Sequence, residues 1–208
     1  MKVLLINGSP KEHGCTDLAL SEVARTLREN GIETEQVWIG TKPVRGCIAC
    51  GGCSGKGRCV FGDDPVNTVL EKMAQADGLV VGSPVYYASA NGSVVSLLDR
   101  MFYAGAGSLF AGKPAAAVVS ARRAGTTASI DELNKYFTIS GMPVVSSSYW
   151  NMIHGNNPQE AAQDAEGLQV MRNLGRNMAW LLHCIEAGKE KGIAFPAQEN
   201  SCRTNFIR

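Results

Sequence analysis

The chain has 208 residues, of which 45% are hydrophobic and 19% charged, and its formal net charge is +1. This length suits one compact α/β domain with a proper core. The balanced charge gives no electrostatic reason to expect nucleic acid or an anionic membrane as a partner, since binding to a phosphate backbone needs a basic surface. No apolar run reaches the roughly 18 residues of a spanning helix, and no signal-like segment precedes the first predicted strand. We therefore expect a cytoplasmic protein with no nucleic-acid and no membrane partner.

The first sixteen residues combine a buried strand, a loop of small residues and the start of a helix. Val3 to Ile6 is a continuous apolar run, Asn7-Gly8-Ser9-Pro10 interrupts it, and Thr16 opens a helix that ends at Gly31. Such a loop directs backbone amides and the positive end of a helix dipole at one point, which favours a phosphate. An ordinary α/β turn without a ligand is the alternative reading. The side chains expected to contribute are Ser9, Lys11 and Thr16.

The rest of the chain alternates predicted strands and helices. Strands are expected at 32–39, 79–81, 115–120 and 142–145, and helices from about Pro65, Ser93 and Thr127 and over Pro158 to Ala187. With the first strand and helix, this order predicts an α/β fold in which a five-stranded parallel sheet carries helices on both faces. Residues 1–190 are expected to form one domain, and residues 191–208 a C-terminal tail without regular period.

Two further loops at the carboxyl ends of predicted strands carry ligand-like residues. Pro84, Tyr86 and Tyr87 are suited to hold a flat aromatic ring, and Arg122 or Arg123 to face its electron-rich edge. Neither Gly-x-Gly-x-x-Gly nor a Walker sequence follows the first strand, so a monophosphate is favoured over a dinucleotide. The three loops together indicate flavin mononucleotide, although packing explains the tyrosines, and a solvated loop the arginines, when each is taken singly.

A cysteine-rich loop is expected at 40–62, where Cys47-x2-Cys50-x2-Cys53-x5-Cys59 is followed by a return to helix. Three thiolates at this spacing can converge on a cubane, and Gly55 and Gly57 provide slack for the fourth, which predicts a [4Fe-4S] cluster. Zinc is one alternative, but zinc sites more often separate two short cysteine pairs by a longer spacer. Thiols that hold no metal are the other alternative. A disulfide framework is not expected, because seven cysteines is an odd number and the cytoplasm is reducing.

The motifs resemble the NADPH-dependent FMN reductase-like branch of the flavodoxin superfamily and, within it, the iron-sulfur flavoproteins. The resemblance rests on Asn7-Gly8-Ser9-Pro10 with Gly14 and Thr16, on residues 82–88 (Gly-Ser-Pro-Val-Tyr-Tyr-Ala) followed by Leu98-Asp99-Arg100, and on the compact cysteine motif. It implies a flavodoxin-like fold, non-covalently bound FMN, NAD(P)H as transient co-substrate, and a homodimer or homotetramer with flavins near the subunit interfaces.

The resemblance also assigns residues to roles. Ser9, Gly14, Cys15 and Thr16 would bind the FMN phosphate, Pro84 to Tyr87 the isoalloxazine, and Ser120 to Gly125 its far edge. Two positions depart from the family pattern, because Lys11 and Cys15 stand where arginine and asparagine are common. Lysine keeps the charge but loses the forked geometry of arginine. The full set of expected cofactor-binding residues is Ser9, Lys11, Gly14, Cys15, Thr16, Ser83, Pro84, Val85, Tyr86, Tyr87, Ser120, Arg122, Arg123 and Gly125, and the expected cluster ligands are Cys47, Cys50, Cys53 and Cys59.

These expectations together describe an FMN-dependent oxidoreductase. Reduced nicotinamide docks over the flavin and transfers a hydride, and the electrons pass on, through the cluster, to a small-molecule or redox-protein acceptor. No side chain is expected to be catalytic in its own right. The alternatives are a flavodoxin-like electron-transfer protein, a cluster-free reductase of FMN, quinones, azo or nitro compounds, and a metal-binding or redox-sensing module without flavin.

Overall fold

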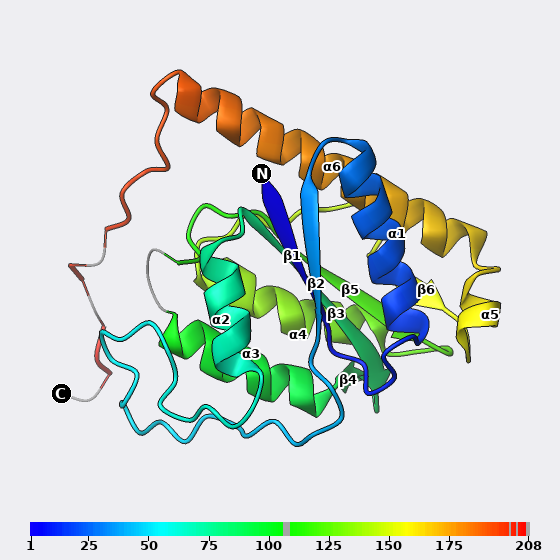
Figure 1. Ribbon diagram of the computed structural model, residues 1–208, viewed down its shortest axis with the longest axis horizontal. Helices are drawn as coiled ribbons and strands as arrows, with labels where there is room; N and C mark the ends of the chain where they lie inside the picture. Colours follow the sequence, from blue (N-terminus) through cyan, green and yellow to red (C-terminus); the bar gives the residue numbers. More distant parts are fainter. Residues whose placement is uncertain (106–108, 200, 203, 207–208) are drawn as a thin grey trace.

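The computed structural model describes residues 1–105, 109–199, 201–202 and 204–206 (Figure 1). Its centre is a parallel sheet of strand order β2-β1-β3-β5-β6. A two-residue strand, β4 (Ser89–Ala90), pairs antiparallel with the end of β3. The expected five-stranded parallel sheet is confirmed, and β4 is a short addition to it. The parallel strands are β1 (Lys2–Asn7), β2 (Glu33–Trp38), β3 (Gly78–Tyr86), β5 (Ala115–Ala121) and β6 (Met152–His154).

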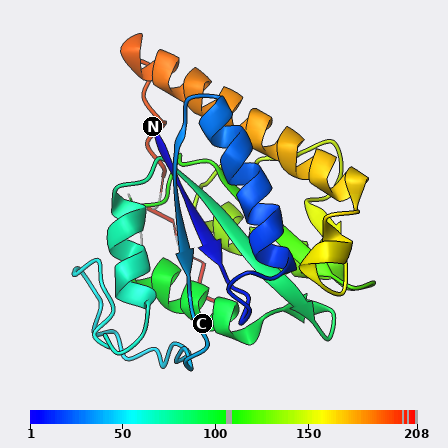
Figure 2. The same ribbon diagram turned by 45° about the vertical axis from the view of Figure 1, so that its right-hand side comes forward.

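Helices cover both faces of the sheet, as expected (Figures 1 and 2). Side chains alternate along each strand, so Val3 and Leu5 of β1 pack against α1 and α6, whereas Leu4 and Ile6 pack against α2, α3 and α4. The sheet therefore separates two apolar cores. The helices are α1 (Cys15–Glu29), α2 (Val66–Ala74), α3 (Gly92–Ala104), α4 (Thr126–Ile139), α5 (Pro158–Ala161) and α6 (Ala165–Glu190).

The loops that follow β1 and β3 leave the sheet side by side. β1 lies between β2 and β3. The chain runs from β1 outward to β2 on one side and then crosses to β3 on the other, so the strand order reverses between β1 and β3. The amide of Gly8 donates to the carbonyl of Gly82 at 2.9 Å. A Cβ atom on Gly8 would lie 1.9 Å from Val94 Cγ2, so the close approach requires glycine. In open α/β sheets, ligands bind at the carboxyl edge beside such a reversal.

The predicted strand at 142–145 is wrong, and the fifth position in the sheet is filled by β6. Val144 makes a single bridge with Ala115, after which the chain leaves the sheet and returns at Met152. The intervening serines bond to α6 instead: Ser147 Oγ donates to the Val170 carbonyl at 2.7 Å. Because this segment bonds to α6, it does not extend the hydrogen-bond ladder with β5 beyond that single bridge.

The predicted helix over 158–187 is divided into α5 and α6. Asp164 caps α6, because its Oδ1 accepts from the amide of Gly167 at 2.9 Å. Its Oδ2 accepts from the amide of His154 at 2.7 Å and so ties the start of α6 to β6. The apolar period correctly predicts the long helix. It does not predict this cap, because the cap depends on a contact with β6.

The cysteine-rich loop and the tail contain no regular structure among the described residues. Residues 40–62 form neither helix nor strand, as expected, and pass α2 and α3 at the carboxyl edge (Figure 1). In the tail, Phe195 lies against Gly112, just before β5. Residues 200, 203, 207 and 208 of the tail lie outside the described residues. In the described part of the chain, no helix has both the length and the apolar character needed to cross a membrane.

Glycine is required where α6 crosses α1, which a pair of alanine substitutions tests. A Cβ atom on Gly175 would lie 2.8 Å from Thr26 Cβ and 3.1 Å from the Val23 carbonyl oxygen, whereas one on Gly188 meets nothing closer than 3.8 Å. We expect Gly175→Ala to lower the free energy of unfolding by about 1–3 kcal/mol through overpacking. Gly188→Ala, in the same helix, should raise it by up to about 1 kcal/mol through helix propensity. Denaturant unfolding measures both, and equal effects would contradict this packing.

Candidate functional site

The loop between β1 and α1 is held in shape by its own polar groups. Asn7 Oδ1 accepts from the amide of Ser9 at 3.1 Å, and Asn7 Nδ2 donates to the Glu12 carbonyl at 2.9 Å. Ser9 Oγ accepts from the amide of Lys11 at 3.1 Å. From β2, Trp38 Nε1 donates to the Ser9 carbonyl at 2.7 Å. These bonds fix the loop before any ligand binds.

The N-terminus of α1 opens from this loop without a side-chain cap. Gly14 occupies the N-cap position and has no side-chain hydrogen bond. The first amides of a helix have no intrahelical partner, so those of α1 remain available to an anion. Nearby, the hydroxyls of Thr16 and Ser120 lie 2.8 Å apart, and both residues are buried. Backbone donors and hydroxyls therefore meet at one point, as the sequence predicts.

A pocket of about 200 Å³ extends from this helix N-terminus along the carboxyl ends of β3 and β5. It joins the three loops that the sequence identifies separately. Tyr86 is half-exposed at its wall. The expected residues that line it are Ser9, Lys11, Gly14, Cys15, Thr16, Pro84, Val85, Tyr86, Ser120 and Arg122.

Four expected residues do not line this pocket. Ser83 is fully buried, and its hydroxyl accepts from the amide of Asn91 at 2.9 Å and donates to the Pro84 carbonyl. Gly125 precedes α4 at a φ of 93°, and a Cβ there would lie 2.5 Å from Ala88 Cα. Both residues shape the loops around the pocket rather than its wall. The side chains of Tyr87 and Arg123 are exposed to solvent.

The structure adds residues that the sequence analysis missed. Gly155 and Asn156 line the pocket directly after β6. Cys15 Sγ donates to the Gly155 carbonyl at 3.6 Å. A Cβ on Gly155 would lie 2.4 Å from the amide nitrogen of Ala161, so the turn requires glycine there. The Gly-Asn-Asn sequence after Met152–His154 is a turn signal that would have revealed this edge, had the last strand been placed correctly.

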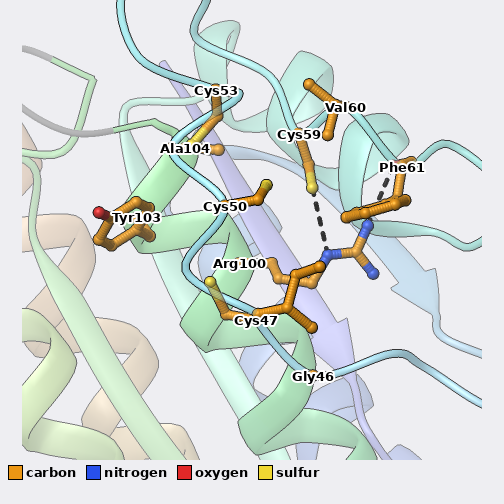
Figure 3. Close-up of a pocket in the computed structure, with 12 residues that line it drawn as sticks. Gly46, Cys47, Cys50, Cys53, Cys59, Val60, Phe61, Arg100, Tyr103 and Ala104 are labelled. Atoms are coloured by element: carbon orange, nitrogen blue, oxygen red, sulfur yellow. Dashed lines mark hydrogen bonds between the residues drawn. The ribbon is translucent and has the colours of Figure 1, made fainter.

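A second pocket gathers the four cysteines of the loop (Figure 3). Cys47, Cys50, Cys53 and Cys59 all line it, together with Phe61, Arg100 and Tyr103. Cys59 Sγ accepts from Arg100 Nε at 3.3 Å. All four are free thiols. Among the residues that the structure describes, no three His, Cys, Asp or Glu side chains lie close enough together to hold a single metal ion.

Comparison with known proteins identifies the chain. A family model for NADPH-dependent FMN reductases matches residues 1–157. The chain belongs to the NADPH-dependent FMN reductase family. This family supports an FMN-dependent oxidoreductase.

Within the FMN reductase family, the chain is similar to iron-sulfur flavoproteins. One of them, from Methanocaldococcus jannaschii, is 34% identical over 193 residues, which are 89% of this chain and 100% of the relative. Another, from Methanosarcina thermophila, is 28% identical over 195 residues, which are 92% of this chain and 100% of the relative.

Solved structures agree on the fold. RosB with a bound flavin-like intermediate superposes with a TM-score of 0.71 at 16% identity, covering 100% of this chain and 92% of that one. An archaeal flavodoxin superposes with a TM-score of 0.59 at 14% identity, and the match covers 88% of this chain and 99% of the flavodoxin. The expected flavodoxin-like fold is therefore confirmed.

The thiol of Cys15 should react slowly in the folded protein. Burial raises the pKa of Cys15, so less thiolate is present near neutral pH than at an ordinary cysteine. We expect iodoacetamide to modify Cys15 more slowly than the exposed Cys184, with mass spectrometry of timed samples as the measurement. In denaturant the two rates should become similar. Equal rates in the folded protein would contradict the raised pKa.

Proposed function

We propose that this chain is an NAD(P)H-dependent oxidoreductase that passes electrons through FMN and a [4Fe-4S] cluster to a small-molecule or redox-protein acceptor. The observation that carries the proposal is the pocket in which an uncapped helix N-terminus, paired hydroxyls and the Pro84–Tyr86 wall meet. A phosphate, a polyol chain and a flat ring need these three surroundings in this order.

The phosphate end of the pocket fits a monoester dianion. The open amides of α1 supply donors, and Lys11 supplies the positive charge at the rim. Thr16 and Ser120 hold each other at 2.8 Å, so one hydroxyl hydrogen stays free to turn toward an acceptor oxygen. We assign these four features to the FMN phosphate.

The other end of the pocket fits the isoalloxazine ring. Pro84, Val85 and Tyr86 provide an apolar edge, and Arg122 lines the same pocket. FMN held here would supply hydride chemistry with reduced nicotinamide and onward electron transfer, singly or in pairs. The protein's part is to orient the ring, to place a guanidinium near it and to leave one face open to the nicotinamide.

The cysteine loop fits a four-iron cluster better than a single ion. Each ligand of a cubane binds a different iron atom, so the four sulfurs stand farther apart than the ligands of one metal ion. The four cysteines share one pocket without converging on a point. Gly51, Gly55 and Gly57 have positive φ angles, which gives the loop freedom to adjust. The relatives named as iron-sulfur flavoproteins support this assignment.

We also propose a homodimer or homotetramer. The flavin pocket is lined by residues just before α3, and the cysteine pocket by residues near its end, so α3 separates them. A helix of 13 residues is about 20 Å long, at roughly 1.5 Å per residue. Tyr87, Tyr149 and Trp150 are exposed aromatic residues of the kind that interfaces cover. A neighbouring subunit would shorten the path between the two cofactors.

A cluster-free FMN reductase is the second candidate function. It needs only the flavin pocket, which no cysteine of the loop at 40–62 lines. Free FMN, quinones, azo compounds or nitro compounds would then be the acceptors. A flavodoxin-like shuttle is less well supported, because the net charge of +1 offers no strongly acidic docking face.

The phosphate assignment predicts a selective loss of FMN affinity. Lys11→Ala should weaken FMN binding about tenfold, the equivalent of one charge-assisted hydrogen bond of about 1.5 kcal/mol. Riboflavin, which lacks the phosphate, should bind as before. Lys42→Ala, at an exposed position in the cysteine loop, is the matched control. Flavin fluorescence during titration of the apoprotein gives both affinities. An equal loss for riboflavin would mean that Lys11 supports the loop and not the phosphate.

The visible spectrum of protein purified without oxygen tests the whole function. We expect flavin bands above a broad cluster absorption, iron and acid-labile sulfide in cluster amounts, and bleaching when NADPH or NADH is added. Cys50→Ala should remove iron and sulfide and leave FMN bound, because Cys50 lines the cysteine pocket and not the flavin pocket. Flavin bands without iron in the parent protein would establish the cluster-free reductase. A colourless protein that takes up no FMN would refute both candidates.

A further inference from the structure

Arg100 of α3 is the largest of the fully buried side chains, with 2% of its surface exposed. Its guanidinium bonds to groups in or beside the cysteine loop, and Figure 3 shows the bonds to Cys59 and Phe61. Nε donates to Cys59 Sγ at 3.3 Å, and Nη2 donates to the Phe61 carbonyl at 3.0 Å. Nη1 donates to the Arg45 carbonyl at 3.2 Å and to Asp64 Oδ2. One side chain therefore joins the two ends of the loop.

The same cysteine is held a second time, from α2. Asn67 Oδ1 accepts from the amide of Cys59 at 2.8 Å, and Asn67 Nδ2 donates to the Cys59 carbonyl at 3.0 Å. The amide, the carbonyl and the sulfur of Cys59 are thus all fixed. Cys47 and Cys50 are exposed, and Ala49 between them has a positive φ of 52°. The sulfur of Cys59 is therefore held in place by the fold, whereas the part of the loop that carries Cys47 and Cys50 can adjust.

The electrostatics around Cys59 are asymmetric. A guanidinium stays protonated in proteins, so Arg100 places a buried positive charge directly against the sulfur. Its counter-charge, Asp64, is also buried and lies on Nη1, away from the Nε that contacts Cys59. Asp64 additionally accepts from the amide of Val66 at 3.3 Å. The Arg100–Asp64 ion pair is therefore oriented with its positively charged member against the sulfur of Cys59.

We propose that Arg100 is a positioning residue for the cluster: it holds the Cys59 sulfur in the ligand pocket, and its Nε–H raises the reduction potential there. The proposal rests on the proposed function, because it assumes the cluster assigned to this loop. Reduction adds negative charge to the iron and sulfur atoms, and a hydrogen bond to a ligating sulfur stabilises the more negative state. Among the described residues, none of the hydrogen-bond partners of Arg100 lines the flavin pocket. The potential of FMN should therefore not change with that of the cluster.

Two substitutions at the ion pair separate this role from simple support of the fold. Asp64→Asn keeps one acceptor oxygen, which can serve either the Val66 amide or Arg100 but not both, and it removes the negative charge, so we expect the cluster potential to rise. Arg100→Gln removes the positive charge beside Cys59 Sγ and leaves at most a neutral amide donor there, so the potential should fall. The double variant removes both charges and leaves neither buried alone, which protects folding. Its potential should lie below that of Asp64→Asn. Redox titration followed by electron paramagnetic resonance measures these shifts.

Arg45→Gln is the matched control. Arg45 is exposed in the same loop and stacks on Phe61, with 4.3 Å between its guanidinium carbon and the ring centroid, but no hydrogen bond links its side chain to a cysteine. Its substitution changes the net charge as Arg100→Gln does, and we expect a much smaller shift of the cluster potential. FMN content and the thermal unfolding midpoint show that each variant is folded.

The outcomes distinguish this inference from the proposed function. Absence of iron in the parent protein refutes the cluster itself. A parent cluster whose potential is unchanged, or moves in the same direction, in Asp64→Asn and Arg100→Gln refutes only the role of Arg100. Loss of iron from Arg100→Gln with retention of FMN, while Asp64→Asn keeps its cluster, supports the positioning role. Equal loss of iron from both single variants would show that the ion pair merely holds the fold.

Discussion

The close approach of Gly8 to Gly82 is the constraint on which the arrangement of the site depends. A Cβ on Gly82 would lie 2.7 Å from Leu20 Cδ1 and 2.8 Å from Thr16 Cγ2, so α1 packs directly on the backbone of β3. Together with the bond from the Gly8 amide to the Gly82 carbonyl, this contact brings the loops after β1 and β3 to one point of the carboxyl edge. The helix N-terminus and the Pro84–Tyr86 wall then face a common pocket.

The loop after β1 and the cysteine loop are built on opposite physical principles. The loop after β1 is tied at several points by Asn7 and Trp38, so its donors are fixed in advance. Preorganised donors suit a cofactor that is held by many modest contacts. The cysteine loop is tied at its Cys59 end, and residues with positive φ angles, Ala49, Gly51, Gly55 and Gly57, occur between its cysteines. Metal–thiolate bonds are strong enough to order such a loop when they form.

Sequence patterns determined the layers of this protein. Continuous apolar strands such as Val3 to Ile6 and Val80 to Val81, alternating with amphipathic helices, leave few solutions other than a parallel sheet covered on both faces. The conformation of the loop after β1 was also predictable, because small residues, hydroxyls and a helix start are local features. The cysteine spacing was equally local. These predictions needed no knowledge of which segments meet in space.

The tertiary structure decided everything that depends on partners distant in the chain. The segment at 142–145 has the composition of a strand, but Ser147 bonds to α6 and the sheet is completed by β6 instead. Because β6 completes the sheet, Gly155 and Asn156, which follow it, line the pocket. Ser83 and Gly125 do not line it but shape the surrounding loops. The sequence shows Arg100 as part of the Leu98-Asp99-Arg100 motif on a helix, with no sign of its partners. Its burial against Cys59 and Asp64 follows from how α3 packs under a loop that lies about 40 residues earlier in the chain, and a local pattern carries no record of such a contact.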